Sequence, residues 1–261
     1  MQLSSLVNAG LLSPSALSES AKIANNLLAT QSFKMVLEAA NYVKKEQVPL
    51  ALVTGAHGTG KTTALQFYHS HSNSLFKECP PKYREKDIAR DLAEMLGIST
   101  GRGWRLRTSV VVEQLKMQPR IIIFDEAQRM DYHALDYLKY VADGSKSSFM
   151  LSASASLAKR IERWPDISTR VGVRVFTQPM SQEEFLSHYQ KAGPEGYNPE
   201  ALKEIHRLSK GIMRTILNIF KQLEDAQNFQ ANAGNSIPNN AITPANIREL
   251  AGKVVLYGQP D

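Results

Sequence analysis

The sequence contains a single cysteine, Cys79, among 261 residues. An internal disulfide framework is therefore excluded, and stability has to come from a packed core. No uninterrupted apolar run reaches the roughly 20 residues that a membrane-spanning helix requires. The N-terminus also lacks the basic and apolar segments of a secretory signal, so we expect a cytoplasmic protein with no membrane partner.

Apolar residues make up 43% of the chain, and 31 Lys and Arg against 25 Asp and Glu give a net charge of +6. A chain of this size and apolar content can bury a full core, so we expect one large domain and a smaller one. The basic excess favours polyanionic partners such as nucleic acid. Charge alone does not establish such a partner, because many basic proteins never bind one.

Short apolar segments alternate with helical patterns over most of the chain. Residues 50–53 are apolar and precede a glycine, as expected of a strand buried on both faces of a parallel sheet. Further strands are predicted within 74–79, "RIIIFDEAQ", "SFMLSASAS" and "VGVRVF". This alternation predicts a doubly wound α/β fold with a parallel sheet flanked by helices.

Beyond Pro179 the strand patterns stop and only helical patterns remain. We therefore predict a short helical N-terminal extension over 1–30 and an α/β nucleotide-binding domain over 31–180. Residues 181–261 are predicted to form a small all-helical lid and a C-terminal tail.

The segment "GAHGTGKT", residues 55–62, matches the pattern G-x-x-x-x-G-K-[ST] between a predicted strand and a helix. Glycines let the backbone curl its N–H groups around phosphates, and the following helix directs its positive end at the same anion. An ordinary glycine-rich turn is the alternative, and the placement between strand and helix disfavours it. The residues expected to contact the nucleotide are Gly55, Ala56, His57, Gly58, Thr59, Gly60, Lys61, Thr62 and Thr63.

The chemistry of this loop requires ATP and Mg²⁺ as ligands. Lys61 would place its charge against the β and γ phosphates, and Thr62 would bind Mg²⁺ through its hydroxyl. Asp125 and Glu126 end the strand in "IIIFDEAQ", at the edge where ligands of parallel sheets bind. Asp125 would hold Mg²⁺, and Glu126 would be the general base of ATP hydrolysis. The alternative is two solvated carboxylates after a strand.

Two arginines are candidates for contacts with the γ-phosphate. Arg214 lies near the start of the helical pattern "GIMRTILNIFKQL" and off its apolar stripe, where a cation opposes the helix dipole unless an anion is near. Arg170 precedes the strand "VGVRVF" and could reach the ATP of a neighbouring subunit. For Arg214 the alternative is an exposed arginine in water, and for Arg170 it is a surface salt bridge.

Together with "LSASAS", "STRVGVRVF" and "GIMR", these motifs resemble the AAA+ ATPases over residues 31 to 252. The spacing is similar to that of the branch with phage Mu B protein, TnsC and IstB-like regulators of DNA transposition, with ExeA-type ATPases as neighbours. The resemblance implies that Ser154 is the sensor-one residue, Arg170 the arginine finger and Arg214 sensor two. Because Asn or Thr is more usual at the sensor-one position, Ser152 is an alternative to Ser154.

The resemblance further implies a protein that forms a ring or helical filament with itself on double-stranded DNA when ATP is bound. Such a protein selects or marks the target and recruits or activates a transposase, and hydrolysis drives disassembly. Two alternatives share the same ATPase domain: a replication initiator or helicase loader, and an ExeA-like ATPase with a non-DNA partner.

The segment "STGRGWRLRTSVV", read as a loop before a helix, has a composition typical of phosphate contacts. Its candidate DNA-binding residues are Arg102, Arg105, Arg107 and Thr108. The alternative is a solvated basic loop with Trp104 packed inward. We expect contacts that are independent of base sequence, because no base-reading helix is recognisable.

Overall fold

The structure is a computed structural model, and it describes residues 30–99, 103–192, 197–232 and 242–255. Residues 1–29 of the predicted N-terminal extension, the candidate Arg102 and the C-terminal residues 256–261 lie outside this part. Among the described residues, no helix is both long and apolar enough to cross a bilayer.

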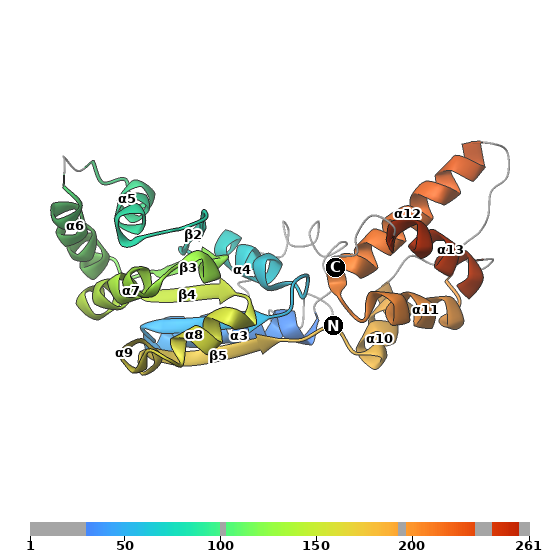
Figure 1. Cartoon of the computed structure of the whole chain (residues 1–261), viewed down its shortest axis with the longest axis horizontal. Coiled ribbons are helices and arrows are strands. Elements are labelled where there is room, and N and C mark those ends of the chain that lie inside the picture. Colours follow the sequence, from blue (N-terminus) through green and yellow to red (C-terminus); the bar gives the residue numbers. More distant parts are fainter. Residues whose placement is uncertain (1–29, 100–102, 193–196, 233–241, 256–261) are drawn as a thin grey trace.

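A parallel sheet of five strands forms the centre of the α/β domain, in the order β2-β3-β4-β1-β5 (Figure 1). The strands are β1 Leu50–Gly55, β2 Leu75–Glu78, β3 Ile121–Asp125, β4 Ser148–Ala153 and β5 Val171–Thr177. The predicted α/β class with a parallel sheet flanked by helices is confirmed.

Helices cover both faces of the sheet because alternate strand residues point to opposite sides. They are α3 Gln31–Glu46, α4 Lys61–Ser70, α5 Glu85–Met95, α6 Trp104–Met117, α7 Tyr132–Ser145, α8 Ala155–Ile161 and α9 Pro165–Ser168, with a short 3-10 helix η2 at Ala127–Arg129. Ala51 and Val53 of β1 lie in a core cluster with α3 and α4. Leu50 and Leu52 lie in a second cluster with α5 to α9.

Four helices follow β5: α10 Gln182–Ala192, α11 Pro199–Ser209, α12 Met213–Asn232 and α13 Pro244–Val255. They share an apolar cluster of their own, which includes Phe185, Ile205 and Ile216. The carboxyl ends of the strands point toward these helices (Figure 1). The helical unit therefore faces the edge of the sheet at which a parallel fold binds its ligands.

The segment that we read as a basic loop begins a helix instead. Helix α6 starts at Trp104, directly after Gly103, which has a φ of 127°. Thr108, Val111, Val112 and Leu115 of α6 are buried, at the i, i+3, i+4, i+7 spacing of one helix face. Arg105 and Arg107 are therefore held on a helix surface.

A buried carboxylate, Asp91 of α5, ties this part of the domain together. It is 3% exposed, accepts a hydrogen bond from Tyr83 Oη at 2.9 Å and lies 2.8 Å from Lys77 Nζ of β2. Burial alone would raise the pKa of Asp91, but the hydrogen bonds from Lys77 and Tyr83 outweigh burial and hold the pKa below its usual value. Its charged form therefore stabilises the fold.

Replacing Asp91 with asparagine should lower the free energy of unfolding by about 2 kcal/mol near neutral pH, because charged hydrogen bonds are lost. Because the pKa of Asp91 is depressed in the folded protein, this stabilisation is fully present at pH values above the unfolded-state pKa of about 3.9. It should therefore disappear as the pH falls through the lower folded-state value. Denaturant unfolding of both proteins from neutral pH to about pH 3 measures the difference.

Glu94→Gln is the matched control, because Glu94 lies on the same helix with a side chain 65% exposed. We expect this control to change the free energy of unfolding by less than about 0.5 kcal/mol. Equal losses in the two variants would contradict the account of Asp91.

Candidate active site

A cavity of about 210 Å³ lies at the carboxyl ends of β1, β3 and β4, against the start of α12. Ten of the residues predicted from sequence line it: His57, Gly58, Gly60, Lys61, Thr62, Thr63, Asp125, Glu126, Ser154 and Arg214. They come from the phosphate loop, α4, β3, the turns after β3 and β4, and the helical unit. The parallel sheet brings them together because its strand ends meet at one edge.

The glycines of the phosphate loop adopt backbone conformations that other residues avoid. Gly55, Gly58 and Gly60 have φ angles of 149°, 76° and 91°. A Cβ on Gly55 would lie 2.2 Å from the carbonyl oxygen of Thr177, and one on Gly58 would lie 2.8 Å from Ile212 Cγ2. Glycine is therefore required at 55 and 58 for contacts with β5 and with the helical unit.

Hydrogen bonds of the Thr59 side chain hold the phosphate loop in place. Its hydroxyl donates to the carbonyl oxygen of Ala56 at 2.9 Å and lies 2.8 Å from the hydroxyl of Thr177. These bonds turn Thr59 toward β5, and Gly55, Ala56 and Thr59 do not line the cavity. His57, Gly58, Gly60 and Thr63 do line it. The loop is therefore held in one shape by bonds to its own chain.

Lys61 is 9% exposed and lies in the first turn of α4. Its ammonium group donates to the carbonyl oxygens of Gly55 at 3.1 Å and Ala56 at 2.7 Å. Burial lowers the pKa of Lys61, and the carboxylates of Asp125 and Glu126 act in the opposite direction. A phosphate in the cavity would offer this buried cation a stronger partner than two carbonyls.

Thr62 and Asp125 join α4 to the end of β3. The Thr62 hydroxyl donates to Asp125 Oδ2 at 2.7 Å, and Asp125 is only 5% exposed. A hydroxyl and a carboxylate side by side are the hard oxygen ligands that suit Mg²⁺. This pair therefore fits the predicted metal, which would neutralise charge between the β and γ phosphates.

Glu126 has a φ of 56° and a ψ of 33°, a left-handed conformation that is unfavourable for a glutamate. Its carboxylate lines the cavity, accepts a hydrogen bond from the Gln128 amide, and lies 3.7 Å from the Arg129 guanidinium. Strain of this kind is concentrated at functional sites.

Two serines line the cavity at the end of β4, and they differ in their partners. The Ser154 hydroxyl is hydrogen-bonded to the Ser156 hydroxyl at 2.7 Å, and its backbone N–H donates to Gln128 Oε1 at 3.2 Å. The Ser152 hydroxyl is buried and has no hydrogen-bond partner within the described residues. Of the two hydroxyls, the one on Ser152 is therefore the one without a hydrogen-bond partner in the part of the chain that the structure describes.

Arg214 connects the helical unit to the phosphate loop. Its backbone N–H donates to the carbonyl oxygen of Gly58 at 3.3 Å, and its side chain lines the cavity. Its charge also contributes to lowering the pKa of Lys61. Met213 and Leu217 of α12 complete this wall, and neither was predicted from sequence. They lie one turn apart on the helix, so only the three-dimensional packing identifies them.

Arg170 lies at the opposite edge of the sheet. Its carbonyl oxygen accepts a hydrogen bond from the N–H of Leu50, the first residue of β1. The strand rises by about 3.3 Å per residue, so its loop end is about 16 Å away. The Arg170 guanidinium lies 3.0 Å from Asp143 Oδ2 and is half exposed. Within one chain the arginine therefore forms the surface salt bridge that we gave as the alternative.

The predicted DNA-binding residues need one correction. Thr108 is 6% exposed, and its hydroxyl donates to the carbonyl oxygen of Trp104 at 2.8 Å, so it is not placed to contact a phosphate. Arg105 is exposed on α6, and its guanidinium lies 5.9 Å from the centre of the Trp104 ring. Arg107 is half-buried on the same helix, and Trp104 packs partly against the core. Helix α6 lies far from the helical unit (Figure 1).

Residues 45–161 match the family model described as an AAA domain. The replication factor C small subunit of Staphylothermus marinus is 28% identical over 193 residues, which cover 72% of this chain and 55% of that protein. The Mu-like prophage FluMu DNA transposition protein B of Haemophilus influenzae is 29% identical over 116 residues, covering 43% of this chain and 40% of that protein. The chain thus spans about half the length of such relatives.

Among solved structures, the Aeropyrum pernix ORC2 protein in ADPNP and ADP complexes superposes with a TM-score of 0.62 at 15% identity. The match covers 88% of this chain and 68% of that one. CDC6P from Pyrobaculum aerophilum gives a TM-score of 0.66, also at 15% identity, over 87% of this chain and 68% of that one. These likenesses show that the fold is shared.

Replacing Lys61 with methionine should lower the affinity for ATP with little change in the free energy of unfolding. The substitution removes a buried charge while keeping an unbranched side chain, so the free energy of unfolding should change by less than about 1 kcal/mol. Affinity for ATP should fall about 100-fold, because charge-assisted hydrogen bonds to phosphate are lost. Thermal unfolding with and without a slowly hydrolysed ATP analogue measures both quantities.

Lys45→Met is the control, because the Lys45 side chain is 82% exposed and outside the cavity. It should leave the ATP-induced rise in melting temperature unchanged. A full ATP-induced rise in the Lys61→Met variant would contradict the placement of phosphate against Lys61.

Proposed function

The chain carries an AAA ATPase domain, and we propose that it uses ATP to assemble on duplex DNA and to regulate DNA transposition. The observation that carries this proposal is the position of Arg170 at the edge of the sheet opposite its own nucleotide cavity. An arginine in that place can complete the site of a neighbouring copy and cannot reach its own. ATP hydrolysis then depends on assembly.

In the proposed reaction, the phosphate loop holds the triphosphate of ATP against Lys61. Glu126 orients a water molecule and accepts its proton while the water oxygen bonds to the γ-phosphorus and the bond to the ADP oxygen breaks. Thr62 and Asp125 would hold Mg²⁺. The unpartnered hydroxyl of Ser152 supports it as the polar contact to the attacked phosphate, in place of Ser154.

Arg214 would report the state of the nucleotide to the helical unit. Its backbone bond to Gly58 and its place in the cavity wall support a direct link between the γ-phosphate and α12. Loss of the γ-phosphate would remove the anion that Arg214 faces. The helical unit would then shift relative to the sheet, and the assembly would come apart.

The DNA contact is proposed for the exposed face of α6 that carries Arg105. Arg107, two residues further along, is half-buried on another side of the helix and is proposed as a second contact. This part of the domain lies far from the helical unit (Figure 1). Contacts of this kind go to phosphates and carry no sequence preference. The face would bind target DNA in many copies along an assembly, so weak contacts add up.

The role in transposition is supported by the similarity to a protein named for DNA transposition, over 43% of this chain. Such a regulator would mark the target and recruit or activate a transposase. A replication role is the second candidate, because the replication factor C small subunit of Staphylothermus marinus matches 72% of the chain. Stimulation of strand transfer by a Mu-type transposase in the presence of ATP would distinguish the first from the second.

A mixing experiment tests the shared site. Arg170→Ala and Glu126→Gln should each abolish ATP hydrolysis on DNA, the first by removing the arginine and the second by removing the general base while ATP still binds. In an equal mixture, random pairing across a head-to-tail interface makes about one site in four complete, so about a quarter of the activity should return. Steady-state phosphate release measures it.

Asp143→Asn is the matched control for Arg170, because it breaks the same salt bridge from the other side. It should keep ATPase activity close to that of the unsubstituted protein. An inactive Asp143→Asn variant, or a mixture without recovered activity, would contradict an arginine that acts on a neighbour.

Replacing Arg105 with alanine should weaken duplex binding equally for different sequences. The slope of log affinity against log salt concentration should fall by about one, because one phosphate contact is lost. Fluorescence anisotropy at several salt concentrations measures this slope. Lys86→Ala, an exposed cation on the neighbouring helix α5, should leave it unchanged. An equal effect of both substitutions would contradict a specific contact on α6.

A further inference from the structure

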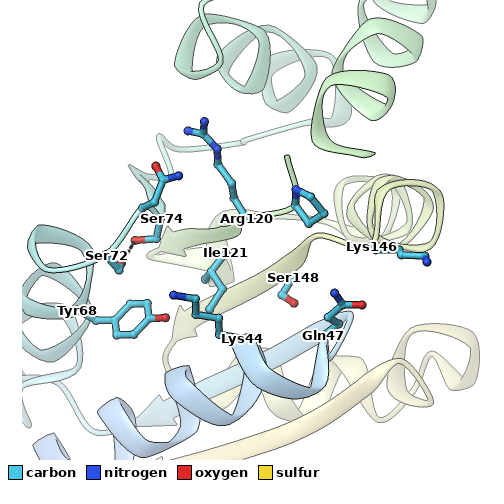
Figure 2. A pocket seen from close by; sticks show the side chains of 11 residues that line it. Lys44, Gln47, Tyr68, Ser72, Ser74, Arg120, Ile121, Lys146 and Ser148 are labelled. Atoms are coloured by element: carbon cyan, nitrogen blue, oxygen red, sulfur yellow. Dashed lines mark hydrogen bonds between the residues drawn. The ribbon is translucent and has the colours of Figure 1, made fainter. Parts of the chain in front are cut away.

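A second cavity, of about 300 Å³, lies at the edge of the sheet opposite the nucleotide site (Figure 2). Its walls come from the end of α3, the end of α4 with the segment that follows, the first residues of β3 and β4, and the residue after α7. The volume is at the lower end of the range for small-molecule sites.

Three cations and no acidic residue line this cavity. Lys44 lies in the last turn of α3, Arg120 precedes β3, and Lys146 follows α7. Within the described residues, none of the three takes part in a salt bridge, and Arg120 Nε is buried without a hydrogen-bond partner. Figure 2 shows the Lys44 ammonium turned toward Tyr68, with the ends of Arg120 and Lys146 directed outward at the rim.

Two largely buried residues, Tyr68 and Ser148, direct their hydroxyls into the same cavity (Figure 2). Tyr68 is 7% exposed and Ser148 is 3% exposed, and both line the cavity. In the described part of the chain, neither side-chain oxygen has a protein hydrogen-bond partner. Burial raises the pKa of Tyr68 to about 12, so its hydroxyl remains a donor at neutral pH. Both hydroxyls are therefore free to bond to a ligand or to water that enters the cavity.

The helix ends around the cavity offer a competing explanation for the cations. Helices α3, α4 and α7 all end here, and a helix C-terminus carries about half a negative charge, which attracts lysine. Three such ends amount to about one and a half negative charges, against three positive charges on the lining side chains. The cavity therefore keeps a net positive charge. The helix dipoles also do not explain why the two hydroxyls lack hydrogen-bond partners among the described residues.

We propose that this cavity binds a phosphate group, with Lys44, Tyr68 and Ser148 as donors to its oxygens. The side-chain amide of Gln47, which also lines the cavity, is available as a further donor. Arg120 and Lys146 attract the anion from the rim. The phosphate belongs either to a small phosphorylated molecule or to the backbone of duplex DNA. The site is separate from the nucleotide cavity and does not depend on the proposed function.

Nuclear magnetic resonance of the full chain with ¹³C-labelled tyrosine tests the proposal. The protein is held with saturating ADP and Mg²⁺, so that the phosphate loop is already filled. Tyr68→Phe identifies the Tyr68 ring signal, which is then followed during titration with orthophosphate at constant ionic strength. We expect this signal to shift with a dissociation constant of about 1 mM or lower.

Lys44→Ala should raise the dissociation constant for orthophosphate about tenfold, because a charge-assisted hydrogen bond is lost. Lys45→Ala removes the same charge one residue away, outside the cavity, and should leave it unchanged. The two sources of phosphate are separated by a second titration with a short duplex. A shift with orthophosphate indicates a small molecule, and a shift with the duplex alone, weakened by Lys44→Ala, indicates DNA.

Three results would overturn the proposal. The first is a Tyr68 signal that does not shift with either probe. The second is an equal dissociation constant for the Lys44→Ala and Lys45→Ala variants. A lower melting temperature for Tyr68→Phe without phosphate would show that the hydroxyl already has a partner in the protein. An unchanged melting temperature is the expected result, because the hydroxyl has no partner to lose.

Discussion

The hydrogen bond between Thr62 and Asp125 joins the phosphate loop to the catalytic edge of the sheet, and the rest of the site depends on it. It fixes the first turn of α4 against the end of β3 through two residues that are 63 positions apart in the chain. Glu126 follows directly in a left-handed conformation and lines the same cavity. A loop free to move relative to β3 could not keep a phosphate and a general base in reacting geometry.

The two edges of the sheet have different roles in this account. The carboxyl edge carries the nucleotide cavity and faces the helical unit, which contacts the phosphate loop through Arg214. The amino edge carries Arg170. In the proposed assembly, copies contact each other head to tail, so that the arginine edge of one copy meets the nucleotide edge of the next and rings or filaments form. The proposal thereby couples hydrolysis to assembly.

Local motifs made much of the site predictable from sequence. The loop 55–62 and Asp125 could be placed because strand, turn and helix follow each other within a few residues, and parallel strands end at one edge. The start of α6 was predicted as a loop, because its glycines and arginines are typical of a solvated loop. The buried face that begins at Thr108 shows that the segment is helical. The cavity around Tyr68 was not predictable, since its walls come from separate segments between Lys44 and Ser148 that only the strand order brings together.

The most direct test of the central claim is an experimental structure of the chain with a slowly hydrolysed ATP analogue, Mg²⁺ and duplex DNA. The account predicts adjacent copies with the triphosphate against Lys61, the metal between Thr62 and Asp125, and the neighbour's Arg170 within hydrogen-bonding distance of the γ-phosphate. A nucleotide bound elsewhere, or copies in contact that leave Arg170 paired with its own Asp143, would contradict it.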